Sequence, residues 1–407
     1  MFAHSRALGL HRGGWFASGA FSQGIATPER GMGQCLIWKA TVSGMEPIRP
    51  DFAGASIAGI IPALLGARSA TWVPAPANGA ESVVLLVLDG LGWAQIEANR
   101  GLLPNISAMQ GSAITSVAPS TTATALTSIT TGLTPIEHGV LGYRVREEDD
   151  VLNILSWRTD QGSRPPEPEA FQRHAAFMGR EVPVVTKSEF RTTGFTKAHL
   201  GGARLEGWST VAVLVEQCAR LALTDPLVYA YYPGVDAVAH EYGLNDDRYF
   251  AELKFADRLV GWILESLPSS TALLITADHG QVEVGRDGWL ETGSLAKYIE
   301  MQAGEGRFRH LYAKQGAAAD LAGAARSEFG DQAWVFTRSE LINDGWFGEG
   351  RPTPSAGRRI GDVVLAAKDC WAFTDPSLRR EAQLISAHGS LTEAEMFVPF
   401  LGARGAR

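Results

Sequence analysis

The chain has 407 residues, enough for one large α/β domain or for a domain with an inserted lobe. Its net charge of -8, without any basic block, argues against a stable nucleic-acid partner. No apolar run reaches the ~18 residues that a membrane span needs. The three cysteines are too scattered to indicate a zinc–thiolate site.

Residues 1–44 differ from the rest of the chain. They are rich in Gly, Ser and Ala and show no sustained hydrophobic periodicity. No apolar core follows a basic start, so a secretory signal is not indicated. The scarcity of acidic residues is compatible with a transit peptide, but a clear amphipathic pattern is missing. We interpret residues 1–44 as a disordered or non-native extension before Met45, and we expect a cytoplasmic protein.

The first strong signal after a short helix within residues 47–68 is the apolar run 83–88. This run contains only Val and Leu, which predicts a strand buried on both faces in the middle of an α/β sheet. It ends in Asp89 and a glycine-rich turn. Ligands of such sheets bind just beyond the carboxyl ends of the strands. Taken alone, Asp89 is more simply explained as a helix N-cap.

A helix built from small residues is expected between Ser120 and Gly132, after a helix near 93–99 and a short strand at 113–117. Its first turn carries the hydroxyls of Thr121 and Thr122. Free backbone N–H groups and the positive end of the helix dipole favour an anion such as phosphate there. A hydroxyl that touches a metal there could become a nucleophile. Local sequence alone favours the simpler role of helix caps.

Polar residues 144–170 predict a surface excursion, with a hairpin near the mouth of the site as one interpretation. Beyond it, the regular alternation of strands and helices resumes. The elements expected there are a strand at 182–186, a helix within 203–223, a strand at 226–232, a helix at 249–267 and a strand at 271–277.

An Asp follows two more of these strands, and His residues accompany both. If Asp236 and His240 are helical, they lie one turn apart on one face. Because the carboxyl ends of parallel strands meet at one sheet edge, these side chains are expected to converge. Asp and His together are ligands for a divalent metal, with zinc the natural occupant. The candidate ligands are Asp89, Asp236, His240, Asp278, His279 and the late His388.

The region 286–355 loses the long strand–helix alternation, so we interpret it as a smaller inserted cap lobe. The core is predicted to resume with a strand at 360–367 and to close with the tail 397–401. The predicted fold is therefore an α/β core with a central, mostly parallel sheet flanked by helices. We assign residues 45–285 and 356–407 to that core.

Several short motifs together resemble the alkaline phosphatase superfamily, and within it the type I phosphodiesterase/nucleotide pyrophosphatase family. The resemblance covers roughly 83–285 and 360–401, and it implies a three-layer sandwich. The motifs are Leu-Asp-Gly-Leu-Gly at 88–92, Pro-Ser-Thr-Thr at 119–122, Thr-Gly-Leu-Thr-Pro-Ile-Glu-His-Gly at 131–139, Asp236-x-x-x-His240, Ala-Asp-His-Gly at 277–280 and His388-Gly389.

The resemblance implies two divalent metal ions, which the equal numbers of His and Asp suggest are Zn²⁺ rather than Mn²⁺. One ion would be held by Asp236, His240 and His388, and the other by Asp89, Thr122, Asp278 and His279. Thr122 would be the nucleophile, with Thr121 as the alternative. The implied reaction is hydrolysis of a phosphodiester or pyrophosphate bond in a small molecule, through a phospho-threonine intermediate.

The chain also departs from the family pattern near the site. Relatives usually place an Asn shortly after the His-Gly pair, to hold a phosphate oxygen, whereas residues 138–143 contain none. Tyr143 is the candidate for that substrate contact. The departure leaves open a phosphomonoesterase or a phosphonate hydrolase of the same superfamily. A non-catalytic binding protein on this scaffold is a third hypothesis, and nothing in the sequence indicates an oligomeric state.

Overall fold

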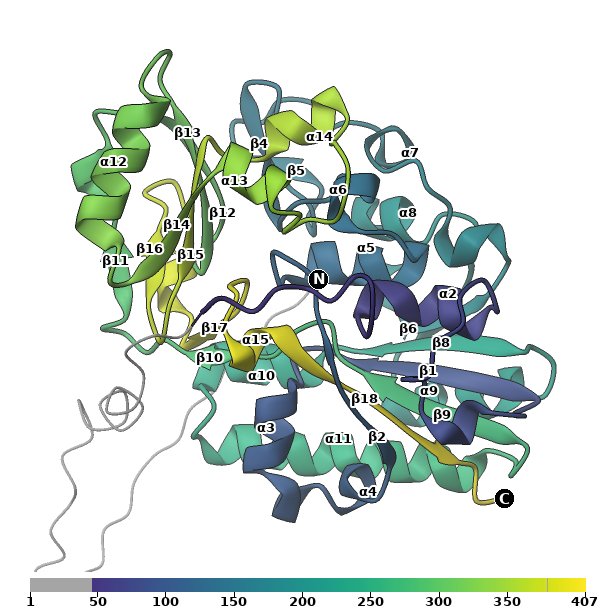
Figure 1. Ribbon diagram of the computed structural model, residues 1–407. Helices are drawn as coiled ribbons and strands as arrows, with labels where there is room; N and C mark the ends of the chain where they lie inside the picture. Colours follow the sequence, from purple (N-terminus) through teal and green to yellow (C-terminus); the bar gives the residue numbers. More distant parts are fainter. Residues whose placement is uncertain (1–45, 379) are drawn as a thin grey trace, which may run out of the picture. The chain divides into compact units, whose positions relative to one another are not determined.

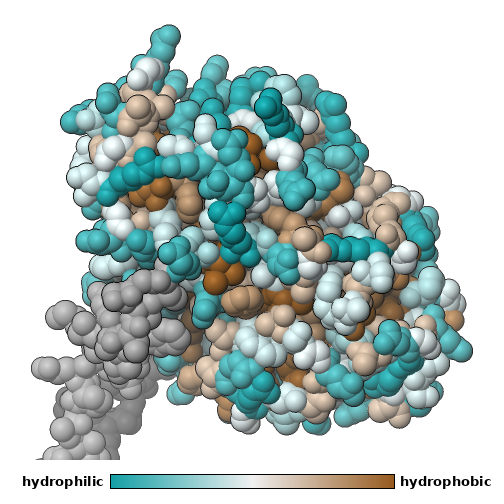
Figure 2. Space-filling model, in the orientation of Figure 1, coloured by the Kyte–Doolittle hydropathy of each residue, from teal (hydrophilic) through white to brown (hydrophobic). Residues whose placement is uncertain are grey.

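The computed structural model describes residues 46–378 and 380–407 (Figure 1). The interpretation of residues 1–44 therefore lies outside the described residues. None of the helices within the described ranges combines the length and the hydropathy that crossing a bilayer requires. The face seen in Figure 2 is largely hydrophilic, with small scattered apolar areas.

A seven-stranded sheet forms the centre of the fold, in the order β2-β18-β9-β1-β8-β6-β7. Strand β18 is antiparallel to both of its neighbours, and the other strands all run in one direction. This arrangement confirms the predicted α/β class with a mostly parallel sheet. The strands are β1 (Ser82–Leu88), β2 (Gln110–Thr115), β6 (Pro183–Lys187), β7 (Arg204–Trp208), β8 (Leu227–Tyr232), β9 (Thr271–Thr276) and β18 (Phe397–Arg404).

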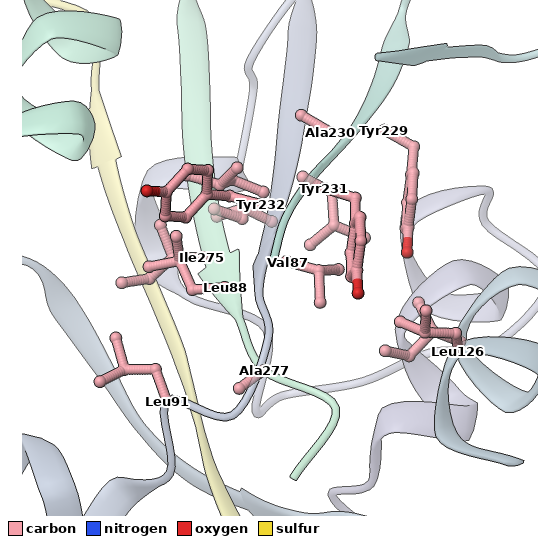
Figure 3. Packing of buried hydrophobic residues seen from close by; sticks show 14 of the residues in the cluster. Val87, Leu88, Leu91, Leu126, Tyr229, Ala230, Tyr231, Tyr232, Ile275 and Ala277 are labelled. Carbon is pink, nitrogen blue, oxygen red and sulfur yellow. The ribbon is translucent and has the colours of Figure 1, made fainter. Parts of the chain in front are cut away.

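The apolar run of β1 lies in the middle of the sheet because both of its faces are covered. Its residues from Val84 onward are fully buried, and β1 pairs with β8 on one side and β9 on the other. On β8, Tyr229 and Tyr231 point to the face that Leu126 covers, whereas Tyr232 points to the opposite face (Figure 3). The two-residue period of a strand explains this alternation.

Helices cover both faces of the large sheet (Figure 1). One face carries α5 (Thr122–Thr131), which packs against η1 (Ile57–Gly59), α2 (Ile60–Leu64) and α8 (Gly194–His199). The other face carries α11 (Asp247–Ser266), which packs against α4 (Pro104–Ser107) and α9 (Val211–Leu221). Every residue of α5 is buried, which agrees with its small side chains. The result is the expected three-layer sandwich.

The polar excursion forms a small antiparallel sheet of β3 (Arg144–Glu147), β4 (Asp150–Asn153) and β5 (Arg158–Thr159). Short helices flank this sheet in sequence, namely α6 (Pro135–His138) and α7 (Pro168–Phe171). Strand β3 also contacts the start of a further sheet, described next. The hairpin interpretation of this region therefore agrees with the structure.

A second, four-stranded antiparallel sheet has the order β12-β13-β15-β14 and packs against α12 (Ala318–Phe329). Its strands are β12 (Ile299–Glu305), β13 (Phe308–Ala313), β14 (Ala333–Thr337) and β15 (Val363–Ala367). The strand predicted at 360–367 is β15, but its assignment to the core sheet was wrong. Strand β15 lies between β13 and β14, which explains why it is apolar and fully buried. The second sheet therefore extends beyond residue 355, the predicted end of the cap lobe. An apolar strand does not reveal which sheet contains it.

The remaining α-helices and short strand pairs lie outside the sheets described above. They are α3 (Trp93–Ala98), α10 (Gly234–Tyr242), the pair β10 (Val282–Glu283) and β17 (Ser386–Ala387), the pair β11 (Trp289–Glu291) and β16 (Ala372–Thr374), α13 (Arg338–Asn343), α14 (Pro354–Arg359) and α15 (Glu393–Met396).

Candidate active site

Asp89 follows β1 at the carboxyl edge of the large sheet. Its amide donates to the Tyr232 carbonyl over 3.0 Å, and its own carbonyl accepts from the Asp236 amide over 3.0 Å. The end of β1 and the start of α10 are therefore fixed to each other by backbone hydrogen bonds. This arrangement brings two of the predicted carboxylates to the same point.

Asp236, His240 and His388 form what we call the rim group. The Nε2 atoms of His240 and His388 lie 3.3 and 3.8 Å from Asp236 Oδ1. The other ring nitrogens face carbonyl oxygens, since His240 Nδ1 lies 2.8 Å from Ser386 O and His388 Nδ1 lies 3.0 Å from Ser120 O. An Nδ1–H donated to a carbonyl leaves the Nε2 lone pair free, which is the usual orientation of a metal-ligating His.

Asp89, Thr122, Asp278 and His279 form what we call the buried group. Nε2 of His279 is at its centre, 3.2 Å from Thr122 Oγ1, 3.3 Å from Asp278 Oδ2 and 3.5 Å from Asp89 Oδ1. On the far side of the ring, His279 Nδ1 lies 3.1 Å from Gly280 O. The same tautomer argument therefore applies, and Nε2 faces the two carboxylates.

Two carboxylate oxygens of the buried group have no hydrogen-bond partner although they are fully buried: Asp89 Oδ1 and Asp278 Oδ2. Burial, together with the nearby charges of Asp278 and Asp236, raises the pKa of Asp89 well above its ordinary value. Burial likewise raises the pKa of Asp278. Buried carboxylates normally require a cation or hydrogen-bond donors. A divalent cation fits this gap, because Asp oxygens and His nitrogens are the donors that zinc accepts.

The two groups are adjacent and share one carboxylate. The ligand atoms of Asp236, His240 and His388 all lie within 4.8 Å of one another, as do those of Asp89, Asp236 and His279. Asp236 therefore belongs to both sets, although the resemblance assigns it only to the first ion. The structure brings every predicted metal ligand into this region.

Thr122 is the first residue of α5 and is 9% exposed. The alternative nucleophile, Thr121, is the N-cap residue of that helix, and its side chain makes no capping hydrogen bond. Thr122 therefore combines contact with His279 and a position among the free N–H groups of the first turn. Its role as the nucleophile stays a prediction.

Tyr143 is joined to the second sheet. Its amide donates to Glu305 Oε2 over 3.2 Å, and its hydroxyl accepts from Asn153 Nδ2 over 3.3 Å. Burial raises the pKa of Tyr143 to about 12, so the hydroxyl is neutral. Residues 138–143 contain no Asn, but Asn153, on β4, lies next to the Tyr143 hydroxyl. Whether Tyr143 contacts substrate stays a prediction.

Two residues that support the site were missed by the sequence interpretation. The Tyr231 hydroxyl donates to Asp89 Oδ2, and Gln281 Nε2 donates to Asp236 Oδ1 over 2.6 Å. Gln281 Oε1 in turn accepts from the Ser386 hydroxyl, which orients the amide. Gln281 directly follows the Asp-His-Gly motif, and this adjacency was the available signal. Tyr231 gave no such signal, because three tyrosines of β8 are equivalent in sequence.

Comparisons with known proteins agree with this geometry. The sequence model of the family described as type I phosphodiesterase/nucleotide pyrophosphatase matches residues 83–391. A comparison with curated protein sequences found no match.

Solved structures give a second comparison, which concerns the fold. Murine ectonucleotide pyrophosphatase/phosphodiesterase 5 is 14% identical, with 79% of this chain and 87% of that chain covered and a TM-score of 0.59. An inactive variant of the murine protein in complex with AMP is also similar, with 13% identity, 79% and 87% coverage and a TM-score of 0.58. Phosphonoacetate hydrolase from Sinorhizobium meliloti 1021, in complex with phosphonoformate, is 18% identical, with 80% and 91% of the two chains covered and a TM-score of 0.57.

Proposed function

Since the chain belongs to the type I phosphodiesterase/nucleotide pyrophosphatase family, in the alkaline phosphatase superfamily, and is a phosphoric ester hydrolase, we propose that it cleaves phosphodiester or pyrophosphate bonds with Thr122 as the nucleophile at a two-zinc site. The contact between Thr122 Oγ1 and His279 Nε2, beside two unpaired buried carboxylate oxygens, is the observation that carries this proposal. A metal ion that these carboxylates would bind lies within reach of the hydroxyl and can activate it as a nucleophile.

The two ions would be held by the rim group and the buried group, and they would supply Lewis acidity and lower the pKa of the Thr122 hydroxyl. The chain's own residues set the geometry. The Thr122 hydroxyl gives up its proton to solvent, and Oγ1 attacks phosphorus while the bond to the leaving oxygen breaks. The leaving oxygen takes up a proton, and a phospho-threonine remains. Water then loses a proton and forms a bond to phosphorus, while the bond to Oγ1 breaks and Oγ1 takes up a proton. The free amides of the first turn of α5 favour the negative phosphoryl oxygens.

Hydrolysis of a phosphonate that carries a second anionic group is the alternative that one observation favours. Lys187 ends β6, at the same sheet edge as Asp89, and its Nζ lies 6.0 Å from the ring centroids of Phe190 and Trp208. The Phe190 ring is 6.3 Å from that of Tyr231, which bonds Asp89. The Lys187 ammonium also pairs with Glu189 over 3.2 Å, so it would have to exchange this partner for a substrate carboxylate. One similar structure is a phosphonoacetate hydrolase in complex with phosphonoacetate.

A non-catalytic binding role is less well supported. A scaffold that had lost catalysis would not need to keep the complete ligand set and Thr122 together at one sheet edge. A small-molecule substrate and a cytoplasmic location stay predictions from the sequence.

The test is a rate comparison on zinc-loaded protein, using bis-p-nitrophenyl phosphate, p-nitrophenyl phosphate and phosphonoacetate. We expect preferred turnover of the diester, lost in Thr122→Ala. Preferred turnover of the monoester or of phosphonoacetate would replace the diester assignment. No turnover of any of the three by zinc-loaded protein would indicate a narrow natural substrate or the binding role.

A further inference from the structure

The short helix α15 connects the segments that carry the predicted ligands. The Glu395 carbonyl accepts from the Gly280 amide over 2.9 Å, directly after His279. The Met396 carbonyl accepts from the Ser116 amide over 2.7 Å, and the Ser116 hydroxyl donates to the Asp278 carbonyl. The backbone of α15 therefore holds the turn that delivers Asp278 and His279.

The same helix fits closely against that turn. A Cβ atom added to Gly280 would lie 1.9 Å from the Ala394 carbonyl oxygen, and one added to Gly92 would lie 3.1 Å from it. Only glycine leaves room for α15 at this distance. A shift of α15 would therefore be transmitted to the turns that follow β1 and β9.

The Glu395 side chain holds the other ligand-bearing loop. Its Oε1 accepts from the Ser390 amide over 2.9 Å, two residues after His388. Ser390 O accepts from the Ser120 hydroxyl over 2.7 Å, and Ser120 O faces His388 Nδ1. Through these three bonds, Glu395 connects to both His388 and the loop that leads into Thr122.

The partner of Glu395 comes from the second sheet. Arg307, in the turn between β12 and β13, donates from Nε to Glu395 Oε1 over 2.7 Å and from Nη2 to Oε2 over 2.8 Å. Both side chains are completely buried. Arg307 Nη1 also donates to the Trp371 carbonyl. A bidentate pair of this kind fixes both position and orientation.

We propose that Arg307 and Glu395 are positioning residues through which the second sheet holds the ligand-bearing loops in their metal-binding arrangement. This inference rests on the proposed two-zinc site. It assigns the second sheet a role in forming the metal centre, in addition to any contact it makes with substrate. The family resemblance does not supply this role, because none of the matched motifs lies in the four strands of the second sheet.

The direction of the expected effect follows from charge. Removing Arg307 leaves the Glu395 carboxylate buried and without its counter-ion, a strongly unfavourable state that the protein relieves by moving or opening α15. Arg307→Lys keeps the charge but not the two-pronged geometry, so it should act in the same direction and more weakly.

Arg309→Met is a matched control. Arg309 belongs to the same second sheet, is fully buried, and pairs with Glu381 while also donating to carbonyl oxygens. None of its hydrogen bonds or ion pairs within the described residues reaches α15. It therefore reproduces the loss of a buried arginine without breaking the connection to the ligand loops.

The experiment has two readouts on the full-length wild type, Arg307→Met, Arg307→Lys and Arg309→Met. The first is amide hydrogen exchange of metal-free protein at Gly280 and Ser390. The second is zinc affinity by chelator competition. We expect exchange at both amides to rise by at least about tenfold and zinc affinity to fall by about 10–100-fold in Arg307→Met, the range for outer-shell partners of metal ligands.

The outcomes separate this inference from the proposed function. If Arg307→Met and Arg309→Met change exchange and zinc affinity equally, Arg307 acts only through general stability and the inference is overturned. If Arg307→Met does not fold, Arg307→Lys decides by the same comparison. If wild-type protein binds no zinc, the two-zinc site is wrong and this inference falls with it, whatever the exchange rates show.

Discussion

The buried group and the rim group contain similar ligands but differ in solvent exposure and in how the protein holds those ligands. The side chains of Asp278 and His279 are fully buried, whereas those of Asp236 and His240 are 17% and 22% exposed. In the rim group, backbone carbonyls and Gln281 hold the ligands in place without an ion. In the buried group, two carboxylate oxygens lack a hydrogen-bond partner and face His279 Nε2 at 3.3 and 3.5 Å. The rim group is thus better pre-organised, and the buried group depends more on its cation.

Thr122→Ala gives the largest expected effect and tests whether the nucleophile belongs to the buried group. We expect kcat to fall by at least about a thousandfold, as for other nucleophile deletions, with zinc still bound. Steady-state kinetics with zinc analysis measures both quantities. Thr121→Ala is the matched control and should retain most activity. A larger loss in Thr121→Ala would transfer the nucleophile to the N-cap position.

Removal of one ligand from each group tests the difference in cation dependence. Asp278→Asn and His240→Ala should each reduce affinity for one ion by more than about 100-fold, beyond what outer-shell changes cost. Stepwise chelation of the wild type, followed by metal analysis, should remove the rim ion first. If the buried ion leaves first, exposure does not govern release and the comparison fails.

Gln281→Ala should weaken the pre-organisation of the rim group while leaving its ligands intact. Loss of the hydrogen bond to Asp236 is expected to lower the affinity of the rim ion by about tenfold. Titration with zinc measures this, and Gln281→Met, which nearly retains the size but cannot donate the hydrogen bond, separates packing from hydrogen bonding. An unchanged affinity in both variants would mean that the α10 backbone alone places Asp236.

The pH dependence of stability should distinguish metal-free from zinc-loaded protein. The pKa values of Asp89 and Asp278 are raised in the folded state, so the folded protein binds more protons than the unfolded chain. The contribution of these two carboxyl groups to the stability of metal-free protein should therefore be fully present below the ordinary Asp pKa and be lost as pH rises through the raised values. The Tm should drop over that pH range by about 1 °C for each kcal/mol of stability lost, since the entropy of unfolding scales with chain length. Asp89→Asn should flatten the curve, whereas zinc, which binds the deprotonated ligands, should reverse its slope. A curve that zinc leaves unchanged contradicts the assignment.

Glu305 provides a second test in that experiment. Burial raises its pKa to about 8, and it ends β12 of the second sheet, outside both groups, with its side chain beside Gly389. Its contribution to stability should be lost as pH rises from its ordinary value through about 8, with or without zinc. Glu305→Gln should remove this part of the pH dependence and shift the Tm by only a few degrees at alkaline pH. Differential scanning calorimetry of both forms checks the result, and a zinc-dependent effect would place Glu305 near the metal centre.

The sequence predicted site residues best where these residues come shortly after a strand. Asp89, Asp236 and Asp278 were identified because each comes after a buried apolar run, and the sheet edge then brings them together. Gln281, Tyr231 and the Arg307–Glu395 pair were not identified, since their roles depend on contacts between segments far apart in the chain. The sheet that contains β15 was misassigned for the same reason. Pairing between distant strands leaves no local pattern.

Strand β18 has a consequence for how the protein is made. It inserts between β2 and β9 and comes after every other described strand, directly behind α15. Until α15 and β18 have been synthesised, β9 therefore presents an unpaired edge, and the ligand loops lack their contacts with α15. Exposed edges of this kind recruit strands from other chains. Overproduction in a host that translates quickly should then yield aggregates that slower synthesis avoids, and metal would be acquired only after α15 has joined the ligand loops.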